Sequence, residues 1–281
     1  MKQNRLFSFI IVAIIYLLAS AVGIVTYYFL PFAFWLNLLI ADIVATVFTF
    51  AFSVLLKNAS VYDPYWSVQP IVIGVAFSIV YGLNLSSAIL LAIVCLWGLR
   101  LTANWAYTFK NLYHQDWRYT MLCEKTGKWY PVINFIGIHL VPTLVVYACA
   151  LPMVAVILYQ PAFNFWMLFG AVLSVCAFTM QGIADIEMHR FRKRKTGGFI
   201  RDGLWKYSRH PNYLGEICMW WGVAFCTLAL MPNRWYLLLG ALLNTLLFLF
   251  VSIPMAERRQ SKKDGYAEYK KQTRALLPIK K

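Results

Sequence analysis

Charge is scarce in this sequence, and acidic residues are the scarcest part of it. Only 13% of the 281 residues are charged, with 26 Lys and Arg against 11 Asp and Glu. The six cysteines form no CxxC pair, so no zinc, other metal or disulfide framework is predicted. With 61% hydrophobic residues and a mean hydropathy of +0.62, hardly any sequence remains for a soluble domain.

Long apolar runs fill the chain instead. A membrane-spanning helix needs about 20 mainly apolar residues. The first run follows Lys2 and Arg5, but it is longer than the apolar region of a signal peptide and ends without a small-residue cleavage pattern, so we expect a retained helix. We predict an all-α polytopic membrane protein with about eight transmembrane helices. The eight stretches are 6–30, 34–56, 68–83, 86–108, 131–159, 163–188, 212–232 and 235–255.

The basic residues gather on one side of this predicted topology. Of the 26 Lys and Arg, 24 fall at the termini and in alternate loops that would share one side of the membrane. The positive-inside rule therefore predicts that both termini are cytoplasmic. Topology and attraction to anionic membrane lipids account for the net charge of +15, so no nucleic-acid partner is predicted.

The most informative motif is Gly203-Leu-Trp-Lys-Tyr-Ser-Arg-His-Pro-Asn-Tyr-Leu-Gly-Glu216. It places five polar residues at the mouth of an apolar stretch: Arg209, His210, Asn212, Tyr213 and Glu216. Ionisable groups are costly in hydrocarbon and usually face a cavity, a partner or a ligand. The proline within the motif favours a helix start, where free N–H groups attract an anion. This signature segment therefore predicts a binding site.

Two further polar groups precede it on the predicted cytoplasmic side. The block Tyr62-Asp63-Pro64-Tyr65-Trp66 is either a turn with interfacial aromatics or a carboxylate and a phenol at the rim of a cavity. Arg100 and Asn104 share one face of a helix. Arg100 either extends to the membrane surface or binds a phosphate or substrate oxygen. Asp42, isolated in the second apolar stretch, is expected to pair within the bundle.

Gln181 and Asp185 also share a helix face, and Arg192 lies two turns further on. Because Asp185 opposes the helix dipole, it needs compensation from Arg190 or Arg192, or a ribose or adenine to hydrogen-bond. The tail 257–278 is either an amphipathic segment on the membrane face or a lid over a cytoplasmic opening.

From about residue 56 to the end, these motifs resemble the steroid 5α-reductase family, and specifically its bacterial membrane-protein relatives. The most specific parts are the signature segment, the Asp185 to Arg192 spacing and Tyr266-Ala-Glu-Tyr269. The resemblance implies a seven-helix bundle that holds NADPH from the cytoplasmic side of a bacterial cell membrane, preceded here by one extra helix. It divides the chain into N-terminal transmembrane helices (1–55) and a catalytic membrane domain (56–281).

The family's reaction is hydride transfer to the β-carbon of an enone, which reduces the conjugated carbon–carbon double bond. The aromatic-rich, apolar stretches imply a hydrophobic substrate that enters from the bilayer, such as a sterol-like, polyprenyl or fatty enone. Asp63-Pro64 stands where steroid reductases have a Gln-Glu pair, and Trp97 stands where they have a Tyr, so Tyr65 is the candidate donor to a developing enolate. Asp63, Tyr65 and Arg100 are the catalytic candidates. The cofactor candidates are Asn104, Arg118, Tyr119, Gln181, Asp185, Arg192, His210, Asn212, Tyr213, Glu216 and Arg258.

The main alternative is a membrane methyltransferase of the isoprenylcysteine or phospholipid type that uses S-adenosylmethionine. Those enzymes share an Arg-His-Pro-x-Tyr-x-Gly element, so residues 209–215 alone fit both classes. Asn212 after the proline and Glu216 directly after Gly215 favour the reductase, as does a tail without paired glutamates. A non-catalytic lipid-binding or scaffolding protein would leave the shared placement of these polar residues unexplained. The substrate and the oligomeric state stay open.

Overall fold

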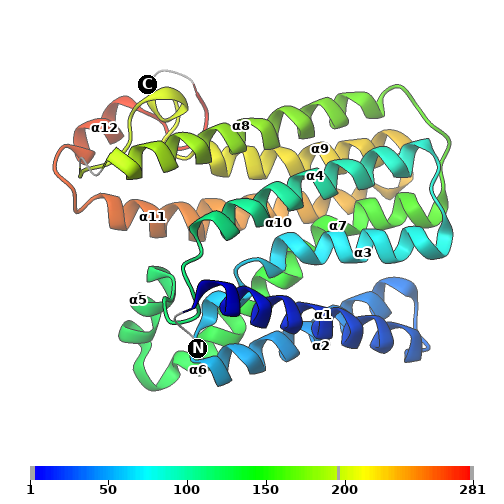
Figure 1. Cartoon of the computed structure of the whole chain (residues 1–281). Coiled ribbons are helices and arrows are strands. Elements are labelled where there is room, and N and C mark those ends of the chain that lie inside the picture. Colours follow the sequence, from blue (N-terminus) through cyan, green and yellow to red (C-terminus); the bar gives the residue numbers. More distant parts are fainter. Residues whose placement is uncertain (1–3, 195–196, 279–281) are drawn as a thin grey trace. The chain divides into compact units, whose positions relative to one another are not determined.

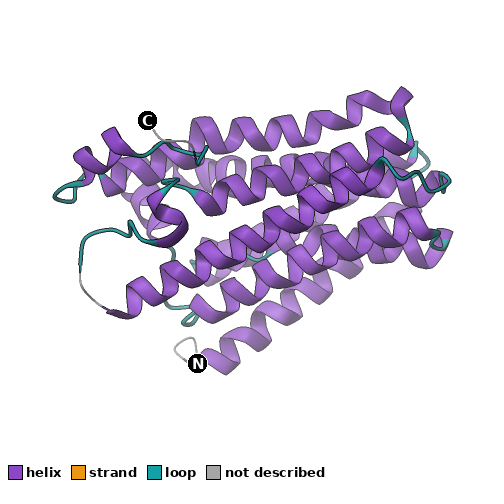
Figure 2. Ribbon diagram, turned by 90° about the horizontal axis from the view of Figure 1, so that it is seen from above, coloured by secondary structure: helices purple, strands orange, loops and turns teal. Residues whose placement is uncertain are grey.

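The computed structural model describes residues 4–194 and 197–278, and they are almost entirely helical (Figures 1 and 2). Among these residues none forms a strand, and a single isolated parallel bridge joins Ser208 to Arg274. The α-helices are α1 (Arg5–Phe29), α2 (Phe34–Leu56), α3 (Tyr65–Tyr81), α4 (Leu85–Thr108), α5 (Trp117–Thr126), α6 (Tyr130–Ile133), α7 (Val141–Tyr159), α8 (Met167–Arg194), α9 (Pro211–Leu230), α10 (Leu239–Leu247), α11 (Ile253–Gln260) and α12 (Tyr266–Gln272).

Eight helical segments of the described chain are long and apolar enough to cross a membrane. The prediction of an all-α polytopic membrane protein with about eight such helices is confirmed. The starts of the third and fifth segments differ most from the predicted ones. The third segment runs from Ala59 to Tyr81 because a 3₁₀ turn, Ala59–Tyr62, leads directly into α3. The fifth extends over Trp117–Tyr159, where a π-helical stretch, Asn134–Leu140, joins α6 to α7.

The chain forms two compact units. The first unit comprises Met1–Val80 and Val94–Leu151, and the second comprises Tyr81–Ile93 and Pro152–Lys281. The division into 1–55 and 56–281 that the family resemblance implies is a different one, and it stays a prediction.

In the first unit, α1 packs against α2, the end of α4 and the residues that follow α4. Arg5 at the start of α1 donates to the carbonyl of Ala106 at 2.9 Å. The hydroxyl of Tyr16 donates to the carbonyl of Val61 at 2.7 Å, which ties α1 to the 3₁₀ turn before α3. One apolar core of this unit is formed by Val12, Ile15, Val61, Phe109 and Leu112.

In the second unit, α8 and α9 pack closely because glycines line their contact. A Cβ atom on Gly170 would lie 2.4 Å from the carbonyl oxygen of Gly222, and one on Gly215 would lie 2.7 Å from that of Ala177. Small residues allow two membrane helices to approach this closely. The approach is antiparallel, so the C-terminal end of α8 lies beside the start of α9, where the signature segment ends.

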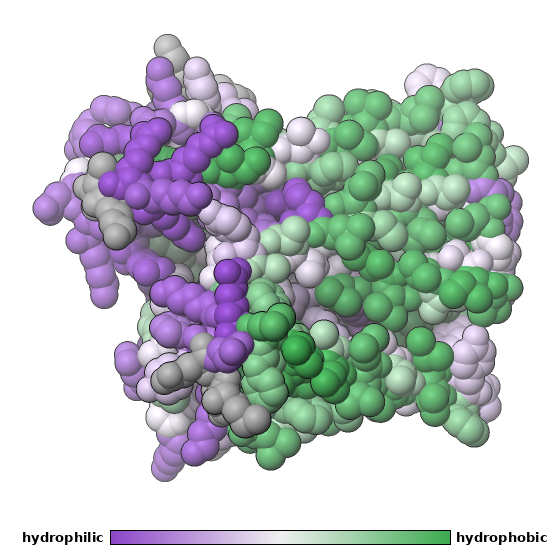
Figure 3. Space-filling model, viewed as in Figure 1, coloured by the Kyte–Doolittle hydropathy of each residue, from purple (hydrophilic) through white to green (hydrophobic). Residues whose placement is uncertain are grey.

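The second unit separates apolar from polar surface along its helices (Figure 3). On α8, large apolar side chains are exposed, among them Phe169, Val172 and Ile183. Hydrophilic residues gather instead around α12 and the C-terminal end of α8. A helix whose exposed face is apolar along most of its length suits a lipid environment.

Candidate functional site

Glu216 is the most buried acidic residue of the second unit, with an exposure of 1%. Its Oε2 accepts a hydrogen bond from Nε2 of Gln181 on α8 at 2.8 Å, and its Oε1 accepts one from Nε1 of Trp220 at 2.9 Å. Gly215 permits this arrangement because it lets α9 lie directly against the backbone of α8. A carboxylate inside a spanning segment thus accepts hydrogen bonds from two neutral donors, a glutamine amide and a tryptophan indole.

Two side-chain oxygens near Glu216 are buried without a partner among the described residues. They are Oε1 of Gln181 and Oδ1 of Asn212. The orientation of the Gln181 amide is fixed because its nitrogen donates to a carboxylate. Buried acceptors normally have donors, so these two atoms fit a ligand that carries N–H or O–H groups.

The Arg-His pair of the signature segment is bound by a residue that the sequence analysis did not assign, Glu257 on α11. Nε of Arg209 donates to Oε1 of Glu257 at 2.8 Å, and Nε2 of His210 lies 3.6 Å from the same oxygen. Lys270 on α12 donates to Oε2 at 2.6 Å. The signal in the sequence was an acid directly after an apolar stretch, but it did not identify the partners.

The C-terminal tail is hydrogen-bonded to the signature segment. The backbone N–H groups of Arg209 and His210 donate to the carbonyls of Arg274 and Ala275 at 3.0 and 3.1 Å. The hydroxyl of Tyr269 donates to the carbonyl of Trp205. Burial raises the pKa of Tyr269, so its phenol keeps the proton for this bond. The tail therefore packs on the protein itself, through the residues that precede α9.

The remaining predicted residues of the second unit lie around the same end. The ring of Tyr213 stacks on His210, with centroids 5.2 Å apart and planes within 5°. Asp185 and Arg192 both lie close enough to His189 to act on it electrostatically. Arg192 and Arg258 are exposed.

In the first unit, three predicted residues from two distant segments come together. The hydroxyl of Tyr119 donates to Oδ1 of Asp63 at 2.5 Å, and Nη2 of Arg118 lies 3.8 Å from the same oxygen. Asp116 caps α5 by accepting from the backbone N–H of Arg118 at 2.9 Å, and it also binds the Arg118 side chain. The 3₁₀ turn before α3 is joined to this group, because the Ser60 hydroxyl accepts from the backbone N–H of Asp116 at 2.8 Å.

Tyr65 belongs to a second polar group of the first unit. Its hydroxyl donates to Oδ1 of Asp42 at 2.9 Å, and Nε2 of Gln69 donates to Oδ2 at 2.6 Å. The expectation that Asp42 pairs within the bundle is thus confirmed. As a donor to a substrate, Tyr65 would have to exchange its bond to Asp42. Arg100 and Asn104 lie one turn apart on α4 and are half-buried.

The predicted site residues therefore form two sets, one in each unit. Asp63, Tyr65, Arg100, Asn104, Arg118 and Tyr119 belong to the first unit, and the other eight belong to the second. Among the described residues, no group of three His, Cys, Asp or Glu side chains could hold a metal ion.

Eight helices are long and apolar enough to cross a membrane, and charged side chains are hydrogen-bonded to partners among them. These features define an integral membrane protein that contains polar sites. The chain belongs to the family described as "Protein of unknown function (DUF1295)", which matches residues 49–273. This family is associated with membrane proteins similar to steroid 5α-reductases.

The chain is also similar to individual proteins of a yeast and a bacterium. It is 27% identical over 225 residues to "Uncharacterized protein C594.04c" of Schizosaccharomyces pombe, a match that covers 69% of this chain and 64% of the relative. It is 30% identical over 131 residues to "Methanethiol S-methyltransferase 1" of Bradyrhizobium diazoefficiens, covering 45% of this chain and 43% of that enzyme. The matches thus span less than two thirds of either relative's length.

Proposed function

We propose that this protein is a membrane-embedded reductase that uses NADPH to reduce a carbon–carbon double bond conjugated to a carbonyl in a hydrophobic, sterol-like or lipid molecule. NADPH, when bound, supplies the hydride for such a reaction. The observation that carries the proposal is the combination, at one end of the second unit, of buried unpartnered acceptors with a strongly basic surface.

The acceptors fit the uncharged parts of this cofactor. Oε1 of Gln181 and Oδ1 of Asn212 are suited to the N–H groups of a carboxamide and to ribose hydroxyls. His210 and Tyr213 offer a stacked pair of rings at the start of α9.

The basic surface fits its phosphates. Burial and the nearby positive charges of Arg259 and Arg192 lower the pKa of Lys263, which indicates a positive potential at this end of the unit. Guanidinium groups bind phosphate oxygens in bidentate fashion, and NADPH carries three phosphates. S-adenosylmethionine carries a positive sulfonium and no phosphate, so the same surface favours it less. We expect this end of the unit to face the cytoplasm.

Reduction of the double bond also requires a proton and polarisation of the carbonyl. Asp63, Tyr65 and Arg100 of the first unit remain our candidates for this work. The bond from Tyr65 to Asp42 supports a role for the phenol, because an adjacent carboxylate can hold a proton and orient the hydroxyl.

The second candidate is a methyltransferase that uses S-adenosylmethionine. The observation in its favour is the 30% identity to an enzyme named methanethiol S-methyltransferase over 131 residues. That stretch is less than half of either chain.

Cofactor binding separates the two candidates. Protein purified in detergent is titrated with NADPH, NADH and S-adenosylmethionine, and binding is followed by nicotinamide fluorescence and by calorimetry. We expect NADPH to bind, and NADH to bind more weakly because it lacks one phosphate. Binding of S-adenosylmethionine without any NADPH response would refute the reductase and favour the methyltransferase.

A matched pair of variants tests the assigned residues. Asn212→Ala removes one hydrogen-bond partner and should weaken NADPH binding roughly two- to tenfold, since such a bond is worth about 0.5–1.5 kcal/mol. Asn164→Ala removes an amide that caps the turn before α8, away from the assigned residues, and should leave binding unchanged. Equal affinity in both variants would remove Asn212 from the site.

A further inference from the structure

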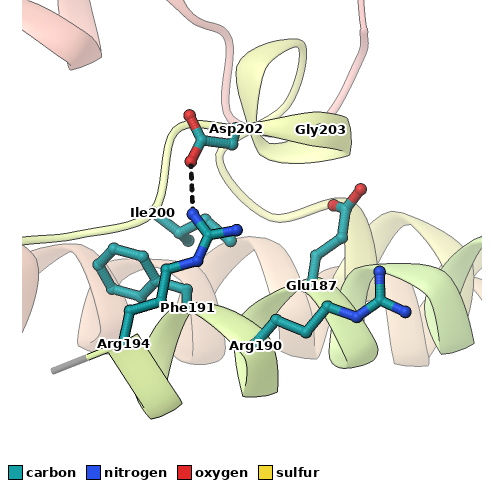
Figure 4. Close-up of a pocket in the computed structure, with 7 residues that line it drawn as sticks. All are labelled: Glu187, Arg190, Phe191, Arg194, Ile200, Asp202 and Gly203. Carbon is teal, nitrogen blue, oxygen red and sulfur yellow. Dashed lines mark ion pairs between the residues drawn. The ribbon is translucent and has the colours of Figure 1, made fainter. Parts of the chain in front are cut away.

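The second unit contains a pocket that the proposed reductase does not use (Figure 4). It has a volume of about 200 Å³ and lies between the last turns of α8 and the segment Ile200–Gly203. Its polar lining consists of Glu187, Arg190, Arg194 and Asp202, and Phe191 contributes an apolar wall.

This pocket is on the opposite side of α8 from the cofactor candidates. Gln181, Asp185 and Arg192 are spaced four and seven residues apart and share the face that binds Glu216 on α9. Glu187, Arg190 and Arg194 follow one another at intervals of three and four, on another face. Because Arg192 and Arg194 are two residues apart, they project about 200° apart around the helix. The two sites are therefore separate.

The loop that closes the pocket is held in place by Glu187. Its Oε2 accepts from the backbone N–H of Leu204 at 3.0 Å. Gly203 adopts a φ of +57°, and a Cβ there would lie 2.0 Å from Oε1 of Glu187. Only glycine fits between the carboxylate and the loop. Ile200 packs with Ala184 and Trp205, and Phe191 packs against that cluster.

The charges of the pocket are only partly neutralised. Arg190 forms no ion pair with any residue that the structure describes. Arg194 approaches Asp202 at 3.9 Å, and both side chains are largely exposed, at 63% and 75%. Such a pair contributes little to stability. Two guanidinium groups and the Asp202 carboxylate are thus available, while Glu187 is occupied by the loop.

The position of the pocket along α8 indicates the source of its ligand. The helix has 28 residues, and about 20 suffice to cross the hydrocarbon core, so about eight extend into the headgroup region. The segment 187–194 that lines the pocket has this length. Basic pockets at this depth bind lipid headgroups.

We propose that this pocket binds the headgroup of an ethanolamine phospholipid. The phosphate lies between Arg190 and Arg194, since guanidinium groups pair with phosphate oxygens. The ammonium donates to Asp202, which explains why a phosphate pocket contains an accessible carboxylate. A purely anionic headgroup would leave this carboxylate opposed to like charge, and a choline headgroup has no N–H to donate.

Native mass spectrometry of the delipidated full chain tests the proposal. Phosphatidylethanolamine, phosphatidylglycerol and phosphatidylcholine with identical acyl chains are titrated separately. We expect the ethanolamine lipid to bind at least tenfold more tightly than the other two. Equal binding of the three lipids, or tighter binding of phosphatidylglycerol, would overturn the proposal. Soluble phosphoethanolamine that binds as tightly as the lipid would overturn the membrane source.

Variants locate the site. Arg190→Gln with Arg194→Gln should weaken the binding of all three lipids at least tenfold, because each of them carries the phosphate. Arg201→Gln with Lys206→Gln removes the same charge from the neighbouring segment without touching the pocket lining, and it should leave the affinities unchanged. Equal loss of affinity in both double variants would show that basic residues attract the lipids without a specific site, and it would overturn the proposal.

A third variant changes a single exposed side chain, so its result does not depend on whether the double variants fold. Asp202→Asn changes one exposed side chain and should lower the preference for the ethanolamine lipid over the choline lipid at least threefold. An unchanged preference would show that Asp202 does not hold the ammonium, and the assignment would fail.

Discussion

Replacement of Glu257 tests the strap between the C-terminal tail and the signature segment. Glu257→Gln removes the charge that binds Arg209 and Lys270. The side chains of Arg209 and Glu257 are only 6% and 12% exposed, and loss of one partner from such a buried pair costs about 3 kcal/mol or more. Lys270 is 54% exposed, so its bond is worth less than about 1 kcal/mol.

Hydrogen exchange measures this difference directly. The amides of Arg209 and His210 donate to carbonyls of the tail, so they exchange when the tail opens. A loss of about 3 kcal/mol corresponds to roughly hundredfold faster exchange in Glu257→Gln, because each 1.4 kcal/mol is a factor of ten. Lys270→Gln should accelerate it less than about fivefold. Unchanged exchange in Glu257→Gln, or an equal effect of both variants, would refute the reasoning.

Three further substitutions should lower the thermal unfolding temperature in detergent. Gly222→Ala places a Cβ 2.5 Å from the carbonyl oxygen of Gly170 and should cost about 1–3 kcal/mol of stability. Gly137→Ala, where no atom lies closer than 3.9 Å, should cost little. Similar losses of stability in both variants would contradict close helix packing. Asp42→Ala leaves two buried donors unsatisfied, at a cost of about 1–3 kcal/mol each. Asp42→Asn should cost less because it keeps one acceptor. A larger loss of stability in Asp42→Asn than in Asp42→Ala would be inconsistent with these hydrogen bonds. Tyr119→Phe removes the bond to Asp63 and should cost about 1.5–3 kcal/mol, with an unchanged unfolding temperature as the refuting result.

The spanning helices could be predicted from the sequence because hydrocarbon demands long apolar runs with internal hydrogen bonding. The start of the third segment could not. The polar block Tyr62-Asp63-Pro64 was expected to be a turn or a cavity rim before the helix. In the structure Asp63 and Pro64 do form a turn directly before α3, and Asp63 accepts a hydrogen bond from Tyr119, 56 residues away in the sequence.

The partners of the polar side chains were the harder part. The i, i+4 rule correctly grouped residues on one helix, but it says nothing about which side chain approaches from another. Glu257 lies 48 residues from Arg209 and 13 from Lys270, and no local pattern links the three. The glycines on α8 and α9 were the usable signal, since they mark where two helices approach and which polar residues meet there.

The buried carboxylates of this protein fall into two physical classes. Glu257 is bound by cations, so its charge is neutralised locally and its role is to hold the tail. Asp42 is held by a tyrosine hydroxyl and a glutamine amide, and no cation pairs with it in the described part of the chain. Neutral donors stabilise a carboxylate without cancelling its field, so a group of this kind still attracts a proton or a donor-bearing ligand. Among the three catalytic candidates of the first unit, Tyr65 is therefore the one that is hydrogen-bonded to a carboxylate of this second class.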